Sequence, residues 1–202
     1  GGNRLAIVTN GGGPGVMAAD RAADLGVTMA TLSDATLAQL NAVLPDTWSH
    51  GNPLDIIGDA TAERYRHAVV HCLQDDGVDG VLVILTPQAM TQPLEVANTI
   101  IEMAAQFDKP LIACWMGEVQ VDASRQAFNR AGIPNFRTPE PAVEVFSFIS
   151  AYYQNQKLLM QTPGPISDHD MPDEEGARLL IEGALAEHRK VLSEIESKAI
   201  LA

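Results

Sequence analysis

The stretch "GVLVIL", residues 80–85, is apolar at every position and ends at the polar segment "TPQAMTQP", residues 86–93. A short, fully apolar run bounded by turn residues predicts a strand that is buried on both faces. The polar segment leads into a predicted helix that runs from Pro93 to about residue 107. This order predicts the central strand of a parallel sheet that has helices on both sides.

The same order of strand and helix continues in both directions along the chain. The predicted strands cover residues 5–9, 27–32, 80–85, 110–115 and 135–138, and the predicted helices cover 15–25, 33–44, 61–74, 93–107, 121–131 and 141–160. This alternation predicts an α/β protein: a doubly wound parallel sheet of about five strands in a three-layer α/β/α arrangement. A flavodoxin-like strand order is favoured, because the chain is too short for two mononucleotide-binding halves and lacks a strict GxGxxG motif.

The C-terminal part differs in character from residues 1–160. Residues 161–175 form a predicted acidic linker, and residues 176–202 a predicted helical linker with helices at 176–187 and from residue 192 onward. The chain opens without a methionine and ends within a helical pattern. We therefore expect it to be a piece of a longer protein.

Composition excludes several kinds of partner. The 202 residues carry a formal net charge of −13, which disfavours nucleic acid and anionic membrane surfaces. No apolar run reaches the roughly 20 residues of a membrane span, and no signal peptide precedes the first strand, so a cytoplasmic protein is expected. Cys72 and Cys114 lack metal or redox spacing and are expected to be buried free thiols.

Three loops follow predicted strands, at the edge of a parallel sheet where ligands bind. The first, Asn10–Gly15, joins a strand to a helix N-terminus, which favours a phosphate or another anion. Its alternative is a tight turn with close helix packing. The second, residues 86–93, offers hydroxyls and amides to an oxyanion, or is only a helix cap with a proline. The third, residues 51–55, is a turn in which Asp55 could hold neighbouring loops together.

The histidines yield weaker hypotheses. His50 beside the third loop could be a catalytic base, but an ordinary loop histidine is favoured. His67 and His71 are four residues apart, a spacing known from metal sites, but no third ligand is evident. No complete catalytic centre can be assembled, so the chain is predicted to receive an anionic group without transforming it alone.

Five segments in this order resemble the second flavodoxin-like ligase domain of the NDP-forming acyl-CoA synthetases, the succinyl-CoA synthetase superfamily. They are "AIVTNGGGPGVMAAD" (6–20), "LGVTMATLSDATLAQLNAVLP" (25–45), "GNPLDIIGDATAERYRHAV" (51–69), "DGVLVILTPQAMTQP" (79–93) and "FRTPEPAVEVF" (136–146). The details are most similar to the bacterial single-chain protein lysine acetyltransferases. The tail "LSEIESKAILA" (192–202) resembles the opening of an ATP-grasp domain, which would follow this chain.

The resemblance implies a cradle for a phosphohistidine that is carried on another domain. The residues that it assigns to phosphate or phosphohistidine binding are Asn10, Gly11, Gly12, Gly13, Gly15, Thr86, Gln88, Ala89, Met90 and Thr91. It implies that Asn52 and Asp55 support the loops. It assigns no catalytic residue and no metal ligand, and none of the five histidines lies in the family's phosphohistidine motif.

Three functions remain open. The first is part of an ADP-forming acyl-CoA synthetase, with acetyl-CoA as the favoured product. That enzyme would use CoA, ATP or ADP, phosphate and Mg²⁺ on other domains, with a CoA-binding and phosphohistidine-bearing domain upstream, an ATP-grasp domain downstream, and an oligomeric assembly. The second is a non-catalytic acyl-CoA-binding regulatory module of a protein lysine acetyltransferase. The third is a free-standing FMN-binding domain, in which Trp48 or Trp115 would have to stack on the flavin.

Overall fold

The computed structural model describes residues 2–161 and 173–201. The chain divides into two compact units, Gly1–Met160 and Gln161–Ala202.

The first unit is built on a six-stranded sheet in which every strand pairing is parallel. The strand order is β2-β1-β4-β5-β6, and β3 also pairs with β1. The strands are β1 (Arg4–Thr9), β2 (Thr28–Met29), β3 (Leu54–Asp55), β4 (Gly80–Leu85), β5 (Leu111–Trp115) and β6 (Asn135–Phe136). Every residue of β4 is buried, which confirms the predicted central strand.

Two short strands share one edge of β1. β2 pairs with Arg4 and Leu5, whereas β3 pairs with Val8 and Thr9 further along the same strand. The six strands therefore occupy five positions across the sheet, which confirms the flavodoxin-like order.

The side chain of Asn52 bridges the gap between β2 and β3. Its Nδ2 donates to the carbonyl oxygens of Leu5 and Ala30 at 2.8 and 2.9 Å, and its Oδ1 accepts from the amide of Ile7 at 2.9 Å. Because this side chain takes the place of strand backbone, β2 ends at Met29, and the prediction of a strand over 27–32 is too long. The strand β3 was missed altogether, since its two residues carry no periodic pattern.

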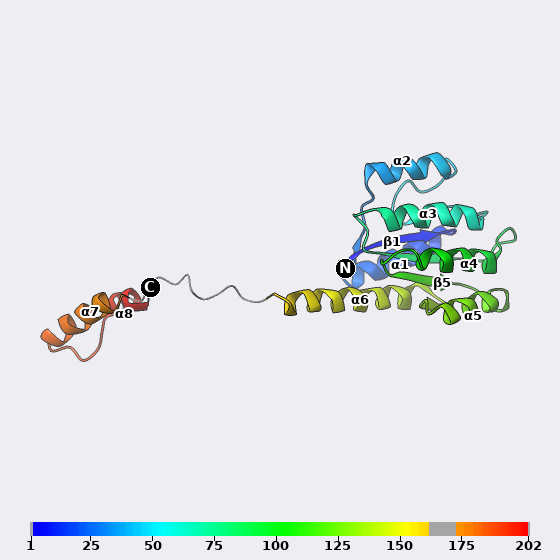
Figure 1. Ribbon diagram of the computed structural model, residues 1–202. Helices are drawn as coiled ribbons and strands as arrows, with labels where there is room; N and C mark the ends of the chain where they lie inside the picture. The colour runs from blue at the N-terminus through cyan, green and yellow to red at the C-terminus, as the bar shows by residue number, and fades with distance from the viewer. Residues whose placement is uncertain (1, 162–172, 202) are drawn as a thin grey trace. The chain divides into compact units, whose positions relative to one another are not determined.

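The helices cover both faces of the sheet (Figure 1). Side chains of α1 and α6 pack on one face, and side chains of α2 to α5 pack on the other. The helices of this unit are α1 (Gly12–Asp24), α2 (Asp34–Val43), α3 (Ala62–Gln74), α4 (Pro93–Ala104), α5 (Asp122–Ala131), preceded by the 3-10 turn η1 (Val119–Val121), and α6 (Pro139–Leu159). The three-layer α/β/α prediction is thus confirmed.

Helix boundaries follow local chemistry. Ser33 accepts a hydrogen bond from the amide of Thr36 and so caps α2, as its position predicts. Gly26 and Gly132 follow α1 and α5 with positive φ angles of 67° and 72°, a backbone conformation that glycine adopts without strain. The start of α1 was predicted at Gly15 and is wrong by three residues, because the first turn of a helix does not need the amide that Pro14 lacks.

The second unit consists of α7 (Glu174–Ala186) and α8 (Glu194–Leu201). Asp173 caps α7 by accepting from the amide of Gly176, and Arg189 forms two hydrogen bonds with the carboxylate of Glu196. Most of the predicted linker at 161–175 lies outside the described residues. Across 2–161 and 173–201, no helix combines the length and apolarity that crossing a membrane requires.

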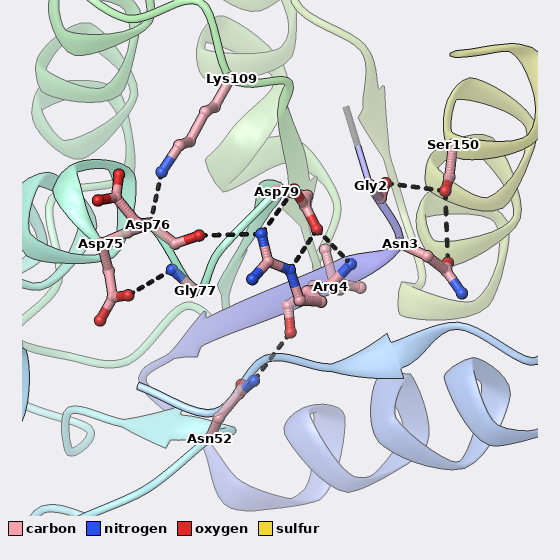
Figure 2. A network of polar contacts seen from close by, with 11 residues as sticks. Gly2, Asn3, Arg4, Asn52, Asp75, Asp76, Gly77, Asp79, Lys109 and Ser150 are labelled. Atoms are coloured by element: carbon pink, nitrogen blue, oxygen red, sulfur yellow. Dashed lines mark hydrogen bonds and ion pairs between the residues drawn. The ribbon is translucent and has the colours of Figure 1, made fainter. Parts of the chain in front are cut away.

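A polar network holds the end of the sheet where β1 and β4 begin (Figure 2). Arg4 donates to both carboxylate oxygens of Asp79 at 2.6 and 3.0 Å and to the carbonyl oxygen of Asp76 at 2.9 Å. The hydrogen bond from Arg4 is the main cause of the lowered pKa of Asp79. This network lies at the edge opposite to the three predicted loops and therefore supports the fold rather than the candidate site.

We expect Asn52→Ala to destabilise the first unit by about 2–4 kcal/mol, because three backbone groups lose their partner. Urea unfolding followed by circular dichroism measures this change. Asn129→Ala is the matched control, since it removes one exposed side-chain contact to Asn135 and should cost less than about 0.5 kcal/mol. Equal stabilities for the two variants would show that the Asn52 bridge contributes little.

Candidate functional site

The three predicted loops meet at the edge of the sheet where the strands end. A β-carbon added to Gly11 would lie 3.4 Å from Oγ1 of Thr86, and one added to Gly15 would lie 3.3 Å from Cβ of Pro53. One added to Gly58 would lie 3.0 Å from the Gln88 side chain. The first loop therefore touches the second and the third, and the chain just after the third loop touches the second.

Asn10 ties the first loop to the second. Its Nδ2 donates to the carbonyl oxygen of Thr86 at 2.8 Å, and its Oδ1 accepts from the amide of Thr86 at 2.8 Å. Asn10 is 1% exposed, so these two bonds are shielded from water. They align the ends of β1 and β4, from which the two loops start.

The N-terminus of α1 has backbone donors without a side-chain cap. Gly11 is the N-cap residue; its own amide donates to Oγ1 of Thr9 at 3.1 Å. Pro14 has no amide hydrogen, and the amide of Gly15 already donates to the carbonyl oxygen of Gly11 at 3.4 Å. The amides of Gly12 and Gly13 therefore remain for a ligand, and no acidic residue in the first turn competes for them.

The glycines of this turn differ in how much space a side chain would have at each position. A β-carbon at Gly15 would lie 3.1 Å from Cγ2 of Thr9, so Gly15 permits close packing of α1 on the sheet. A β-carbon at Gly12 would lie 3.2 Å from Oδ2 of Asp55. A β-carbon at Gly13 would meet no atom within 4 Å, so a side chain at this position would point into open space. Of the two sequence interpretations, close packing describes Gly15, and the assignment of Gly13 to phosphate binding stays a prediction.

The second loop is closed by its own hydrogen bonds. Oγ1 of Thr91 accepts from the amide of Gln88 at 2.8 Å and donates to the Gln88 carbonyl oxygen at 2.9 Å. The hydroxyl of Thr91 is therefore already engaged. Ala89 and Met90 are exposed at the tip of this loop, and Thr86 is the residue that lies against the first loop. The roles assigned to Gln88, Ala89, Met90 and Thr91 stay predictions.

A fourth loop, which the sequence pattern did not predict, follows β5. A β-carbon at Gly117 would lie 3.0 Å from Cγ of Pro87, which places this loop against the second one. Nη2 of Arg125 donates to the carbonyl oxygens of Trp115 and Gly117 at 2.7 and 2.6 Å. The signals in the sequence were a glycine just after a strand and an arginine on the apolar side of the next helix.

The structure places His50 within a hydrogen-bonded loop and His71 in a partly buried position on α3. Both ring nitrogens of His50 lie within hydrogen-bond distance of acceptors, Oδ1 of Asn41 at 2.8 Å and the carbonyl oxygen of Asp46 at 2.9 Å. Burial is the main cause of the lowered pKa of His71. Among the described residues, no group of three or more His, Cys, Asp or Glu could hold a metal ion.

Buried side chains near the sheet do not offer a nucleophile or a flavin platform. Both cysteines are buried free thiols, as predicted, and burial raises the pKa of Cys72 and of Cys114 to about 12. Such thiols remain protonated at neutral pH and are poor nucleophiles. Trp48 and Trp115 are also fully buried, so neither ring can stack on an FMN at the surface.

Comparisons with known proteins identify relatives of this chain. Residues 5–159 match the family described as Ligase-CoA domain. The chain is 43% identical over 154 residues to an ADP-forming acetate–CoA ligase of Methanocaldococcus jannaschii, covering 74% of this chain and 22% of that protein. It is 40% identical over 148 residues to ADP-forming acetate–CoA ligase I of Archaeoglobus fulgidus, covering 73% and 21%.

A solved structure shares the fold. It is that of an acetyl-coenzyme A synthetase 1 from Ca. Korarchaeum cryptofilum in complex with phosphate and ADP. The TM-score is 0.73 at 28% identity, covering 80% of this chain and 36% of that chain. The chain spans about a fifth of the length of the two ligases above.

We expect Asn10→Ala to loosen the junction between the first two loops, because the amide and the carbonyl oxygen of Thr86 lose their partners. The expected cost is about 2–3 kcal/mol, with faster hydrogen exchange at the Thr86 amide measured by NMR. Asn3→Ala is the control, since its bond to the Gly26 carbonyl oxygen lies at the opposite edge. Unchanged exchange at Thr86 in Asn10→Ala would contradict the proposed tie.

Proposed function

The chain belongs to the Ligase-CoA domain family, and from this membership we propose that it supplies part of a phosphate cradle in an ADP-forming acyl-CoA synthetase. The reaction of that enzyme is acyl-CoA + ADP + phosphate = acid + CoA + ATP, and acetate is the proposed acid because the relatives are acetate–CoA ligases.

The uncapped N-terminus of α1 carries this proposal. The amides of Gly12 and Gly13 are left without a side-chain cap at the positive end of the helix. Donors fixed in this way stabilise a phosphoryl group without having to reorganise when it arrives. A phosphate ligand in the related Korarchaeum enzyme supports the proposed chemistry.

The residues of this chain would bind and orient a phosphoryl group but would not break its bonds. Gly12 and Gly13 would donate backbone hydrogen bonds, and the hydroxyl of Thr86 lies next to the preceding residue, Gly11. Asn10 would hold the two loops in register. Both cysteine thiols are buried and their pKa is raised, so the proposal assigns no nucleophile to the described residues. The carrier of the phosphoryl group, proposed to be a histidine, would therefore come from another domain.

The remaining parts of the reaction are proposed to lie outside this chain. The relatives are much longer ligases, so domains that bind CoA and nucleotide are expected in the complete protein. We place a CoA-binding and phosphohistidine-bearing domain upstream and an ATP-grasp domain downstream, in an oligomeric assembly. Mg²⁺ would be held by those domains, since the described part of the chain has no suitable cluster of ligands.

The alternative from the sequence is a regulatory module of a protein lysine acetyltransferase that binds acyl-CoA without turnover. The names of the relatives favour the ligase. The same cradle would serve both functions, so the activity of the complete protein separates them.

We expect Gly13→Leu to weaken the binding of inorganic phosphate by about tenfold, because the side chain would stand where the site opens. An NMR titration of the Gly12 amide measures the affinity. Gly183→Leu is the matched control: it is another helical glycine with nothing within 4 Å, but it lies on α7. Neither variant should unfold the chain. If phosphate binds Gly13→Leu as tightly as the wild type, the loop is structural and the cradle is misplaced.

For the complete protein, incubation with γ-labelled ATP, CoA and acetate should produce acetyl-CoA together with acid-labile phosphate on the protein. The 202-residue chain alone should show no turnover, because the phosphoryl carrier is proposed to lie on another domain. If the complete protein forms neither product but binds acetyl-CoA and acetylates lysine, the regulatory alternative holds. Turnover by the chain alone would contradict the proposal that the phosphoryl carrier and the CoA and nucleotide sites lie on other domains.

A further inference from the structure

The two oxygens of the Asp55 carboxylate have different surroundings. Oδ1 accepts a hydrogen bond from the amide of Ile57 at 3.0 Å. Oδ2 faces Gly12, where a β-carbon would lie only 3.2 Å away. No donor among residues 2–161 and 173–201 forms a hydrogen bond with Oδ2. One oxygen is therefore used by the loop, and the other is free beside the first turn of α1.

The free oxygen lies on the side from which a ligand would approach. The Cα–Cβ bond of a helical residue tilts toward the helix N-terminus, so an atom next to the β-carbon position of Gly12 lies close to the open end of α1. The amides of Gly12 and Gly13 point out of that same end. An anion held by these amides would thus lie close to Oδ2.

The charge of Asp55 is not balanced by a nearby cation. Arg64, on the adjacent helix α3, forms an ion pair with Asp59 and donates to the carbonyl oxygen of Ile56 at 3.1 Å. No ion pair with Asp55 occurs in the described part of the chain. A carboxylate accepts hydrogen bonds but cannot donate them. It therefore repels a bare anion, whereas it binds an anion that carries its own hydrogen.

This difference separates phosphate from sulfate. At neutral pH inorganic phosphate is a mixture of H2PO4⁻ and HPO4²⁻, both of which carry a P–O–H group, whereas sulfate carries no hydrogen. We propose that Asp55 is a specificity-determining residue of the cradle: Oδ2 accepts the hydrogen bond of a protonated phosphate and rejects sulfate. This inference rests on the proposed function, because it assumes that the N-terminus of α1 binds a phosphoryl group.

Competition between inorganic phosphate and sulfate tests the proposal. Both ions are titrated into the 202-residue chain at pH 7 and constant ionic strength, and the amide resonances of Gly12 and Gly13 report binding by NMR. The wild-type chain should bind phosphate about tenfold more tightly than sulfate, or better. In Asp55→Asn the amide group can donate to sulfate, and its Oδ1 still accepts from Ile57. The ratio of the two affinities should therefore fall close to one.

Asp59→Asn is the matched control, since it removes a carboxylate four residues away that pairs with Arg64. Its ratio should equal that of the wild type. Equal affinities for the two ions in the wild type, or an unchanged ratio in Asp55→Asn, would overturn the proposed role of Asp55. Neither result would contradict the proposed phosphate binding at the N-terminus of α1. If the wild type binds neither ion, the proposed function itself fails. If Asp55→Asn does not fold, the wild-type ratio still tests the proposal, because equal affinities for the two ions would overturn it.

Discussion

The hydrogen bonds that Asn10 exchanges with Thr86 set the geometry on which the candidate site depends. They join the ends of two neighbouring parallel strands, whose backbone pairing runs as far as Thr9 and Ile84. Beyond those residues the sheet no longer dictates where the chain goes. A buried amide side chain can satisfy one donor and one acceptor at once, so a single residue continues the alignment of the strands into the loops.

Asn52 performs a related task on the other side of β1. Its amide group binds backbone of β1 and of the segment after β2, in the gap that the short strands leave. Two asparagines thus replace missing strand backbone on either side of β1. The glycine turn that follows β1 is positioned between them and does not have to be held by its own side chains.

The start of α1 lacks features that usually stabilise a helix. A capping side chain is worth about 1 kcal/mol, and glycine is an unfavourable helix residue. The N-cap residue of α1 is Gly11, which has no side chain to cap the helix, and the first turn contains Gly12 and Gly13. The start of α1 thus departs from the local rules of helix stability, as functional sites commonly do. The phosphate cradle that we propose here would use the uncapped donors of this turn.

The sequence alone determined the α/β class, the order of the elements and the family resemblance. Hydrophobic runs such as Gly80–Leu85 and helical periodicity are local patterns that can be recognised in a single sequence. It could not locate β3, the early start of α1 or the fourth loop at Gly117. It named Asn10, Gly12, Thr86 and Asp55 as candidates but could not say which atoms face one another. The tertiary structure decided that, because hydrogen bonds such as Asn10–Thr86 join residues 76 positions apart. Such contacts depend on how strands are placed side by side, which no local pattern records.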